Sequence, residues 1–136
     1  MLLLLMPAAH AAGMDEDFLA AREAYRTGQA TKVAAYAKRF KGHIFEPYLA
    51  YWQLNPRLEQ ASPAEVRAFL SSYGDTPLAE RLRVDWLKLL AKNRQWEIFE
   101  EELPRVAGED LDLTCYTLQA RMRLNPTETL KEARPL

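Results

Sequence analysis

One expected helix, over residues 77–92, carries apolar side chains on two opposite faces. At about 100° per residue, one broad arc of this helix holds Leu78, Leu82, Trp86, Leu89 and Leu90. The nearly opposite arc holds Val84, Leu87 and Ala91. The narrow polar stripe that remains contains Arg81, Asp85, Lys88 and Lys92. A helix with two apolar faces is buried between neighbours in a layer, which favours stacked helical hairpins over a four-helix bundle.

The rest of the chain after residue 14 has the same helical periodicity, interrupted at short intervals by stop signals. Helices are expected over residues 15–27, 30–40, 47–54, 63–73, 77–92, 96–103 and 111–124, and the last ten residues begin another. Ser62-Pro63-Ala64-Glu65 is a capping box, and Gly28 and Gly74 are stop signals. Hairpins recur about every 30 residues, and no alternating β pattern occurs. The sequence therefore predicts an all-α fold, a right-handed α-superhelix (α-solenoid) of antiparallel helical hairpins.

Composition narrows the classes of partner and site. The chain has 136 residues, is 49% hydrophobic and has a net charge of −1, which indicates one modest folded domain. Its cations are spread along the sequence, so we expect no nucleic-acid partner. One cysteine and two histidines supply neither an internal disulfide nor a His/Cys metal cage. We therefore expect no metal and no cofactor.

The first thirteen residues, MLLLLMPAAHAAG, are uncharged and differ from the rest of the chain. They end near Ala9-His10-Ala11, a small-x-small triplet typical of a signal cleavage site, although no Lys or Arg precedes the apolar run. We interpret residues 1–11 as the remnant of a secretion signal, residues 12–136 as the mature domain, and the periplasm as its location. The alternative is an apolar N-terminal helix packed on the domain. The run is shorter than a membrane-spanning helix, so no stable membrane insertion is expected after signal removal.

Four segments occur in an order and spacing that resemble a known family. They are Pro47-Tyr48-Leu49-Ala50-Tyr51-Trp52-Gln53-Leu54, the stretch 69–83, the stretch 86–96 with its Trp86 and Trp96, and Cys115-Tyr116 with Ala120. Together they resemble the N-terminal superhelical, U-shaped domain of the soluble lytic murein transglycosylases. The resemblance extends from about Asp17 to Met122.

This resemblance implies membership of a cell-wall lytic system. The family cleaves the MurNAc–GlcNAc glycosidic bond of peptidoglycan with one glutamate of a separate lysozyme-like C-terminal domain. The family's catalytic Glu-Ser pair and its Gly-Leu-Met-Gln run are absent from this sequence, so no catalytic residue is carried over. We expect a non-catalytic scaffold domain, truncated before the catalytic domain, with peptidoglycan or that missing domain as partner. The alternative is a stand-alone exported α-solenoid adaptor that binds a protein or peptide.

Individual candidate residues each have a plain structural explanation. The acidic run Glu100-Glu101-Glu102 is expected to be a solvated helix face rather than a carboxylate pair for glycoside cleavage. Cys115, between Leu113 and Leu118, is expected to be a buried structural thiol, and His43 an exposed turn residue. The aromatic residues Tyr48, Tyr51 and Trp52 are expected to pack between helices rather than stack on sugars.

The one basic grouping that supports a binding hypothesis consists of Lys32, Lys38, Arg39 and Lys41. It would suit the acidic peptides of murein, and the alternative is an ordinary solvated face.

Overall fold

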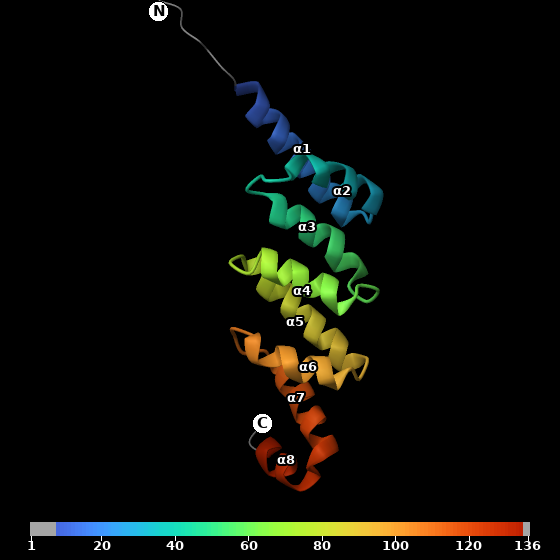
Figure 1. Ribbon diagram of the computed structural model, residues 1–136, viewed down its shortest axis with the longest axis vertical. Coiled ribbons are helices and arrows are strands. Elements are labelled where there is room, and N and C mark those ends of the chain that lie inside the picture. Colours follow the sequence, from blue (N-terminus) through green and yellow to red (C-terminus); the bar gives the residue numbers. More distant parts are fainter. Residues whose placement is uncertain (1–7, 135–136) are drawn as a thin grey trace, which may run out of the picture. The chain divides into compact units, whose positions relative to one another are not determined.

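A computed structural model describes residues 8–134 of the chain, and side chains from Gly13 onward (Figure 1). The α-helices in this part are α1 (Ala8–Arg26), α2 (Ala30–Ala37), α3 (Glu46–Leu54), α4 (Pro63–Ser72), α5 (Pro77–Lys92), α6 (Trp96–Glu102), α7 (Leu111–Leu124) and α8 (Pro126–Ala133). Single 3₁₀ turns, Lys38–Phe40, Asn55–Arg57 and Leu103–Arg105, extend α2, α3 and α6. Residues 8–134 contain no β-strand, so the all-α prediction is confirmed.

The N-terminal helix begins earlier than the sequence predicts. We expected it to start near Asp15, whereas α1 starts at Ala8, because alanine has the highest helix propensity and Gly13 alone does not end the helix. Residues 1–7 of the expected signal lie outside the described residues, and residues 8–11 form the first turn of α1. Within the described part, no helix has the length and apolar character needed to cross a membrane.

Side chains at two helix starts satisfy backbone N–H groups; the sequence predicts the first, at Ser62, but not the second, at Asp110. Ser62 Oγ accepts a hydrogen bond from the N–H of Glu65 at 3.2 Å, and Asp110 Oδ1 accepts one from the N–H of Leu113 at 3.0 Å. In a capping box the Glu65 carboxylate would also accept a hydrogen bond from the backbone N–H of Ser62. In the structure this carboxylate accepts hydrogen bonds from Arg57 instead. These caps fix the first turns of α4 and α7.

Buried positions recur every 33 residues along the chain. The first set lies in the first helix of each hairpin and consists of Ala21, Leu54, Leu87 and Ala120, with exposed fractions of 0%, 5%, 0% and 2%. The second set lies in the return helices and consists of Val33, Val66 and Phe99, with exposed fractions of 1%, 0% and 0%. The return helices α2, α4 and α6 begin at residues 30, 63 and 96, which are also 33 residues apart. Residues 8–134 therefore form four consecutive hairpins in one repeating register.

Two of the turns between paired helices have the same hydrogen bonds. After α1, the N–H of Gly28 donates to Tyr25 O and the N–H of Gln29 to Ala24 O; after α5, Arg94 donates to Ala91 O and Gln95 to Leu90 O. Both chains of bonds are Schellman-type helix ends, which place one residue in the left-handed conformation. That residue is Gly28 at φ 71° in the first turn and Arg94 at φ 58° in the second.

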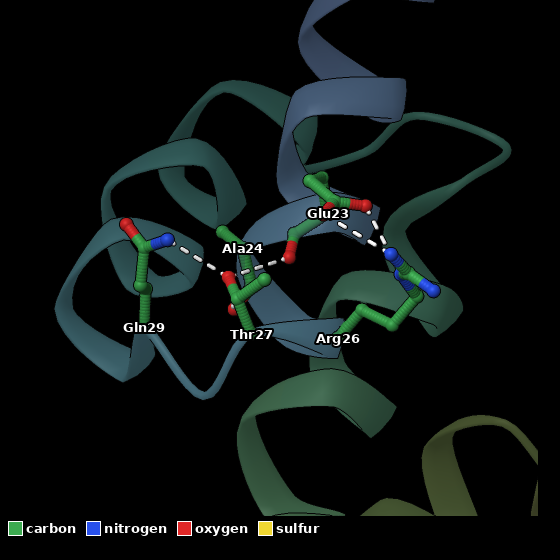
Figure 2. A network of polar contacts seen from close by, with 5 residues as sticks. All are labelled: Glu23, Ala24, Arg26, Thr27 and Gln29. Carbon is green, nitrogen blue, oxygen red and sulfur yellow. Dashed lines mark hydrogen bonds and ion pairs between the residues drawn. The ribbon is translucent and has the colours of Figure 1, made fainter.

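Side chains brace the first of these turns (Figure 2). Thr27 Oγ1 donates to Glu23 O at 2.8 Å, and Gln29 Nε2 donates to Thr27 Oγ1 at 2.8 Å. Arg26 forms an ion pair with Glu23 at 3.1 Å, which lowers the pKa of the Glu23 carboxyl below its usual value. The reversal of the chain between α1 and α2 is therefore held by both backbone and side-chain bonds.

We predict that Arg94→Gly raises the free energy of unfolding by about 0.5 to 1 kcal/mol. Glycine has no Cβ and adopts a positive φ without strain, whereas arginine pays for that conformation. Gly28→Ala, the matched change in the equivalent turn, should lower the free energy of unfolding by about 1 kcal/mol. Urea titrations followed by circular dichroism measure both, and a destabilised Arg94→Gly variant would contradict the turn assignment.

The described chain divides into two compact units, the first ending at Tyr73 and the second beginning at Gly74. Unit 1 has an aromatic core, in which the ring of Phe18 lies 4.4 Å from that of Phe45 and 5.2 Å from that of Trp52. Unit 2 has a core of aliphatic and aromatic side chains around Leu82, Leu87 and Phe99, all with exposed fractions of 0%. The two apolar faces predicted for α5 are confirmed, because both Leu82 and Leu87 are buried.

Candidate functional site

Unit 1 has a groove formed by α2, α3 and α4. It consists of two adjoining hollows, of about 370 and 290 Å³, which share Ala50, Gln53 and Tyr73. Small residues line both hollows: Ala34 and Ala37 on α2, Ala50 on α3, and Ala68 and Ser72 on α4. We call this surface the α2–α4 groove. Short side chains let an extended ligand approach the helices closely.

Lysines carry the free charge of the α2–α4 groove. Lys38, in the 3₁₀ turn that extends α2, and Lys41, which follows that turn, both line its first hollow. Both lysines are exposed, and neither forms an ion pair with another described residue. Two positive charges that form no ion pair with another described residue therefore lie at one end of the groove, in the hollow that Glu46 also lines.

The acidic residues of the groove are already engaged. Glu46 Oε2 accepts a hydrogen bond from the N–H of Gly42 at 2.6 Å, and Glu46 Oε1 accepts one from the hydroxyl of Tyr73 at 3.2 Å. Burial, together with the Glu46 charge, raises the pKa of Tyr73 above its usual value. Glu65 binds Arg57, which lowers the pKa of the Glu65 carboxyl. Glu46 keeps its negative charge, because both of its donors are neutral, so the first hollow holds two lysines and one carboxylate.

Only two residues of the predicted basic grouping lie together in the groove. Lys38 and Lys41 line the groove, whereas Arg39 points elsewhere and binds Asp17 Oδ2 at 2.7 Å. Lys32 is exposed and does not line either hollow. The sequence-based prediction did not include Gln53, which lines both hollows and donates a hydrogen bond from Nε2 to Leu49 O at 3.3 Å. The one sequence signal that could have identified Gln53 is its place directly after the aromatic residues Tyr51 and Trp52.

Two predicted aromatic residues are packed, and a third is open to solvent. Tyr51 and Trp52 have exposed fractions of 4% and 8%, which confirms that they pack between helices. Tyr48 is 42% exposed, with its ring edge-on to Phe18 at 5.8 Å. Tyr51 and Trp52 therefore support the core of unit 1, whereas Tyr48, which we also expected to be packed, touches Phe18 but is exposed to solvent.

The predictions for His43 and Cys115 are wrong in opposite directions. His43 is half-buried rather than exposed, since it lies against Phe40 and Phe45 and its Nδ1 accepts a hydrogen bond from the N–H of Phe45 at 3.2 Å. Cys115 is exposed rather than buried. It lies on a second apolar face of α7, opposite the face that carries the buried Leu113 and Ala120. Apolar neighbours in the sequence do not reveal which face is covered.

One residue of the acidic run is also placed differently from the prediction. Glu100 and Glu101 are exposed as expected, but Glu102 has an exposed fraction of 0%. Its carboxylate lies 3.1 Å from Arg105 Nη1 and 3.6 Å from Arg83 Nη1. The 33-residue register explains this burial, because Glu102 occupies the position of the buried Phe69.

Glu102 does not form a catalytic centre. A glycosidase acid has to reach the scissile oxygen in an open cleft, whereas Glu102 is closed to solvent and held by two guanidinium groups. Among the described residues, no group of three or more His, Cys, Asp or Glu side chains is placed to hold a metal ion. The α2–α4 groove is therefore the candidate binding site of the described surface.

Comparison with known proteins adds no assignment. No family model, no curated protein and no solved structure matches this chain. Inferences about its function therefore rest on its own residues and their geometry.

Proposed function

We propose that this chain is a non-catalytic helical-repeat scaffold that binds an extended ligand along the α2–α4 groove. The observation that carries this proposal is the groove itself, an open surface floored by small residues and positively charged at one end. Repeats of helical hairpins characteristically bind extended partners on such surfaces. The carboxylates of Glu46, Glu65 and Glu102 are held by Tyr73, Arg57 and Arg105, respectively. A carboxylate held in this way is less able to act as a catalytic acid, which supports a binding role.

We further propose that the hairpins stack as an α-solenoid with a right-handed superhelical course. The equal 33-residue spacing supports this arrangement, because a constant repeat length gives each hairpin the same relation to the next. Packing within the units also supports it, since α3 contacts α1 in unit 1 and α7 contacts α5 in unit 2.

The four segments that resemble the superhelical domain of the lytic murein transglycosylases suggest a more specific role. We propose that the scaffold serves a peptidoglycan-cleaving enzyme of the lytic transglycosylase type, in the periplasm, with the glycosidic chemistry supplied by another domain. Peptidoglycan peptides carry carboxylates, which Lys38 and Lys41 would attract, since the two lysines outnumber the one carboxylate, Glu46, that lines the same hollow. This places the acidic peptides, rather than the sugars, against the groove.

We predict that the double variant Lys38→Glu/Lys41→Glu binds purified peptidoglycan roughly tenfold more weakly than the unaltered chain. Co-sedimentation with insoluble sacculi, at several salt concentrations, measures this affinity. The control is Lys32→Glu/Lys92→Glu, which makes the same change in charge at exposed lysines that do not line the groove. Equal losses in the two double variants would mean that overall charge, and not the groove, governs binding.

The second candidate is a stand-alone adaptor for a protein or peptide. The open form of the groove favours it, because a cleft shaped around a sugar would be more enclosed. Binding of an acidic peptide of alternating Asp and Ala, with no binding to sacculi, would favour the adaptor over the cell-wall scaffold. Loss of that peptide binding in Lys38→Glu/Lys41→Glu would still locate the ligand in the α2–α4 groove.

A further inference from the structure

Unit 1 has a further cavity, of about 210 Å³, between the start of α2 and the end of α3. Ala30 and Val33 of α2 line it, and Arg57 lies in the 3₁₀ turn that follows α3. Its remaining wall is aromatic, since the rings of Tyr25 and Trp52 stack with their centres 5.7 Å apart. We call this cavity the α2–α3 pocket. An apolar cavity of about 150 Å³ holds a benzene molecule, so the pocket has room for an aromatic ring.

The 33-residue register gives the α2–α3 pocket an equivalent place in unit 2. Two repeats after Ala30 and Arg57, the chain has Trp96 and Arg123. The repeat also retains two lining glutamines, Gln29 and Gln53, as Gln95 and Gln119. The Trp96 ring lies 5.5 Å from the guanidinium carbon of Arg123 and 5.7 Å from the ring of Phe99. Unit 2 therefore has an indole ring beside an arginine where unit 1 has an alanine and a cavity.

The polar groups of the α2–α3 pocket are arranged to accept the same ring. The guanidinium of Arg57 is held along its edge by the carboxylate of Glu65, through two hydrogen bonds. A guanidinium held by its edge keeps a flat face that can stack on an aromatic ring. Gln53 Nε2 donates to Leu49 O, and no described residue donates to Gln53 Oε1, which can accept a hydrogen bond from an indole N–H.

We propose that the α2–α3 pocket binds the indole ring of a tryptophan side chain that belongs to a peptide partner. The ring takes the place that Trp96 has in unit 2, against Trp52 and beside the flat face of Arg57. The peptide backbone has a path out of the pocket, because Gln53 and Arg57 also line the second hollow of the α2–α4 groove. The choice of a peptide rests on the adaptor function proposed for that groove, whereas the fit of the ring does not.

The first test fills the pocket with the chain's own side chain. Isothermal titration calorimetry should show one site for acetyl-Ala-Trp-Ala-amide, which binds about tenfold more tightly than acetyl-Ala-Leu-Ala-amide. Ala30→Trp should weaken this binding about tenfold or more, because it places an indole where Trp96 stands at the start of α6. Ala64→Trp makes the same change at an exposed residue of α4 that does not line the pocket, and should leave binding unchanged.

The second test opens the equivalent place in unit 2 and leaves unit 1 unaltered. Trp96→Ala should raise the stoichiometry from one to two peptides per chain, because its new alanine matches Ala30. This variant decides the question if Ala30→Trp does not give the circular dichroism spectrum of a folded helical chain. Lys38→Glu/Lys41→Glu should leave binding of the short neutral peptide unchanged, so failure of the charged groove and failure of the pocket are distinguishable.

Four results would overturn the proposal. They are no binding of acetyl-Ala-Trp-Ala-amide at about 5 mM, equal binding of the leucine peptide, unaltered binding in Ala30→Trp, and a single site in Trp96→Ala. Free indole that binds as tightly as the tryptophan peptide would contradict a peptide as the source of the ring.

Discussion

Trp86→Ala is expected to lower the free energy of unfolding by about 3 to 5 kcal/mol. Trp86 is 2% exposed and lies on the arc of α5 that also carries the fully buried Leu82. Truncation removes a large apolar side chain and leaves a cavity that the neighbouring helix cannot close. Urea unfolding followed by far-ultraviolet circular dichroism measures the loss without depending on the fluorescence of the residue that is removed.

The control for this change is Lys92→Ala, at an exposed position of the polar stripe of α5. It should change the free energy of unfolding by less than about 0.5 kcal/mol. Lys88, which the sequence places on the same stripe, is unsuitable because its Nζ lies 2.9 Å from both Asp110 Oδ2 and Asp112 Oδ2. Similar denaturation midpoints for Trp86→Ala and Lys92→Ala would show that the faces of α5 are wrongly assigned.

Glu102→Ala is expected to cost about 3 kcal/mol, because it removes a fully buried carboxylate from beside the largely buried Arg83, which keeps its contact with Glu80 at 3.7 Å. Arg105 is 56% exposed and can turn toward water, whereas Arg83 is 15% exposed and loses its contact with Glu102. Glu102→Gln keeps the shape and should cost less, since its amide oxygen still accepts hydrogen bonds. Thermal and urea unfolding measure both variants.

The neighbouring Glu100→Ala provides the control for position within the acidic run. Glu100 is exposed, so its removal should change the free energy of unfolding by less than about 0.5 kcal/mol. Equal effects at Glu100 and Glu102 would contradict the burial of Glu102 and its place in the 33-residue register.

Helix positions could be predicted because their signals are local. The turn chemistry at Thr76-Pro77 and the Asp110 cap fix where α5 and α7 begin, and both helices lie where the sequence places them. The start of α1 was missed because an alanine-rich stretch continues a helix without a distinct cap.

Burial was harder to predict because it depends on which helix lies opposite. Cys115 and Leu82 occupy equivalent positions, yet only Leu82 is covered. The 33-residue register is obscured in the sequence because the same buried position holds a small residue in one hairpin and a large one in the next, as at Ala21 and Leu54. Glu102 shows the opposite effect, with a charged residue at a position where Phe69 is apolar.

The binding groove was predictable only in part. Lys38 and Lys41 belong to a basic grouping that the sequence displays, but the 3₁₀ turn at Lys38–Phe40 turns Arg39 away toward Asp17. The floor of the groove comes from alanines on three different helices, which have no common signal in the sequence. Such a surface becomes recognisable only when the helices are placed side by side.

The most direct test of a non-catalytic scaffold is one incubation of the whole chain with purified peptidoglycan. Protein in the pellet measures binding, and anhydromuropeptides in the supernatant measure cleavage of the glycosidic bond. We predict that the chain sediments with the peptidoglycan through Lys38 and Lys41 and releases no anhydromuropeptides. Release that disappears when a single Glu or Asp of this chain is replaced would contradict it.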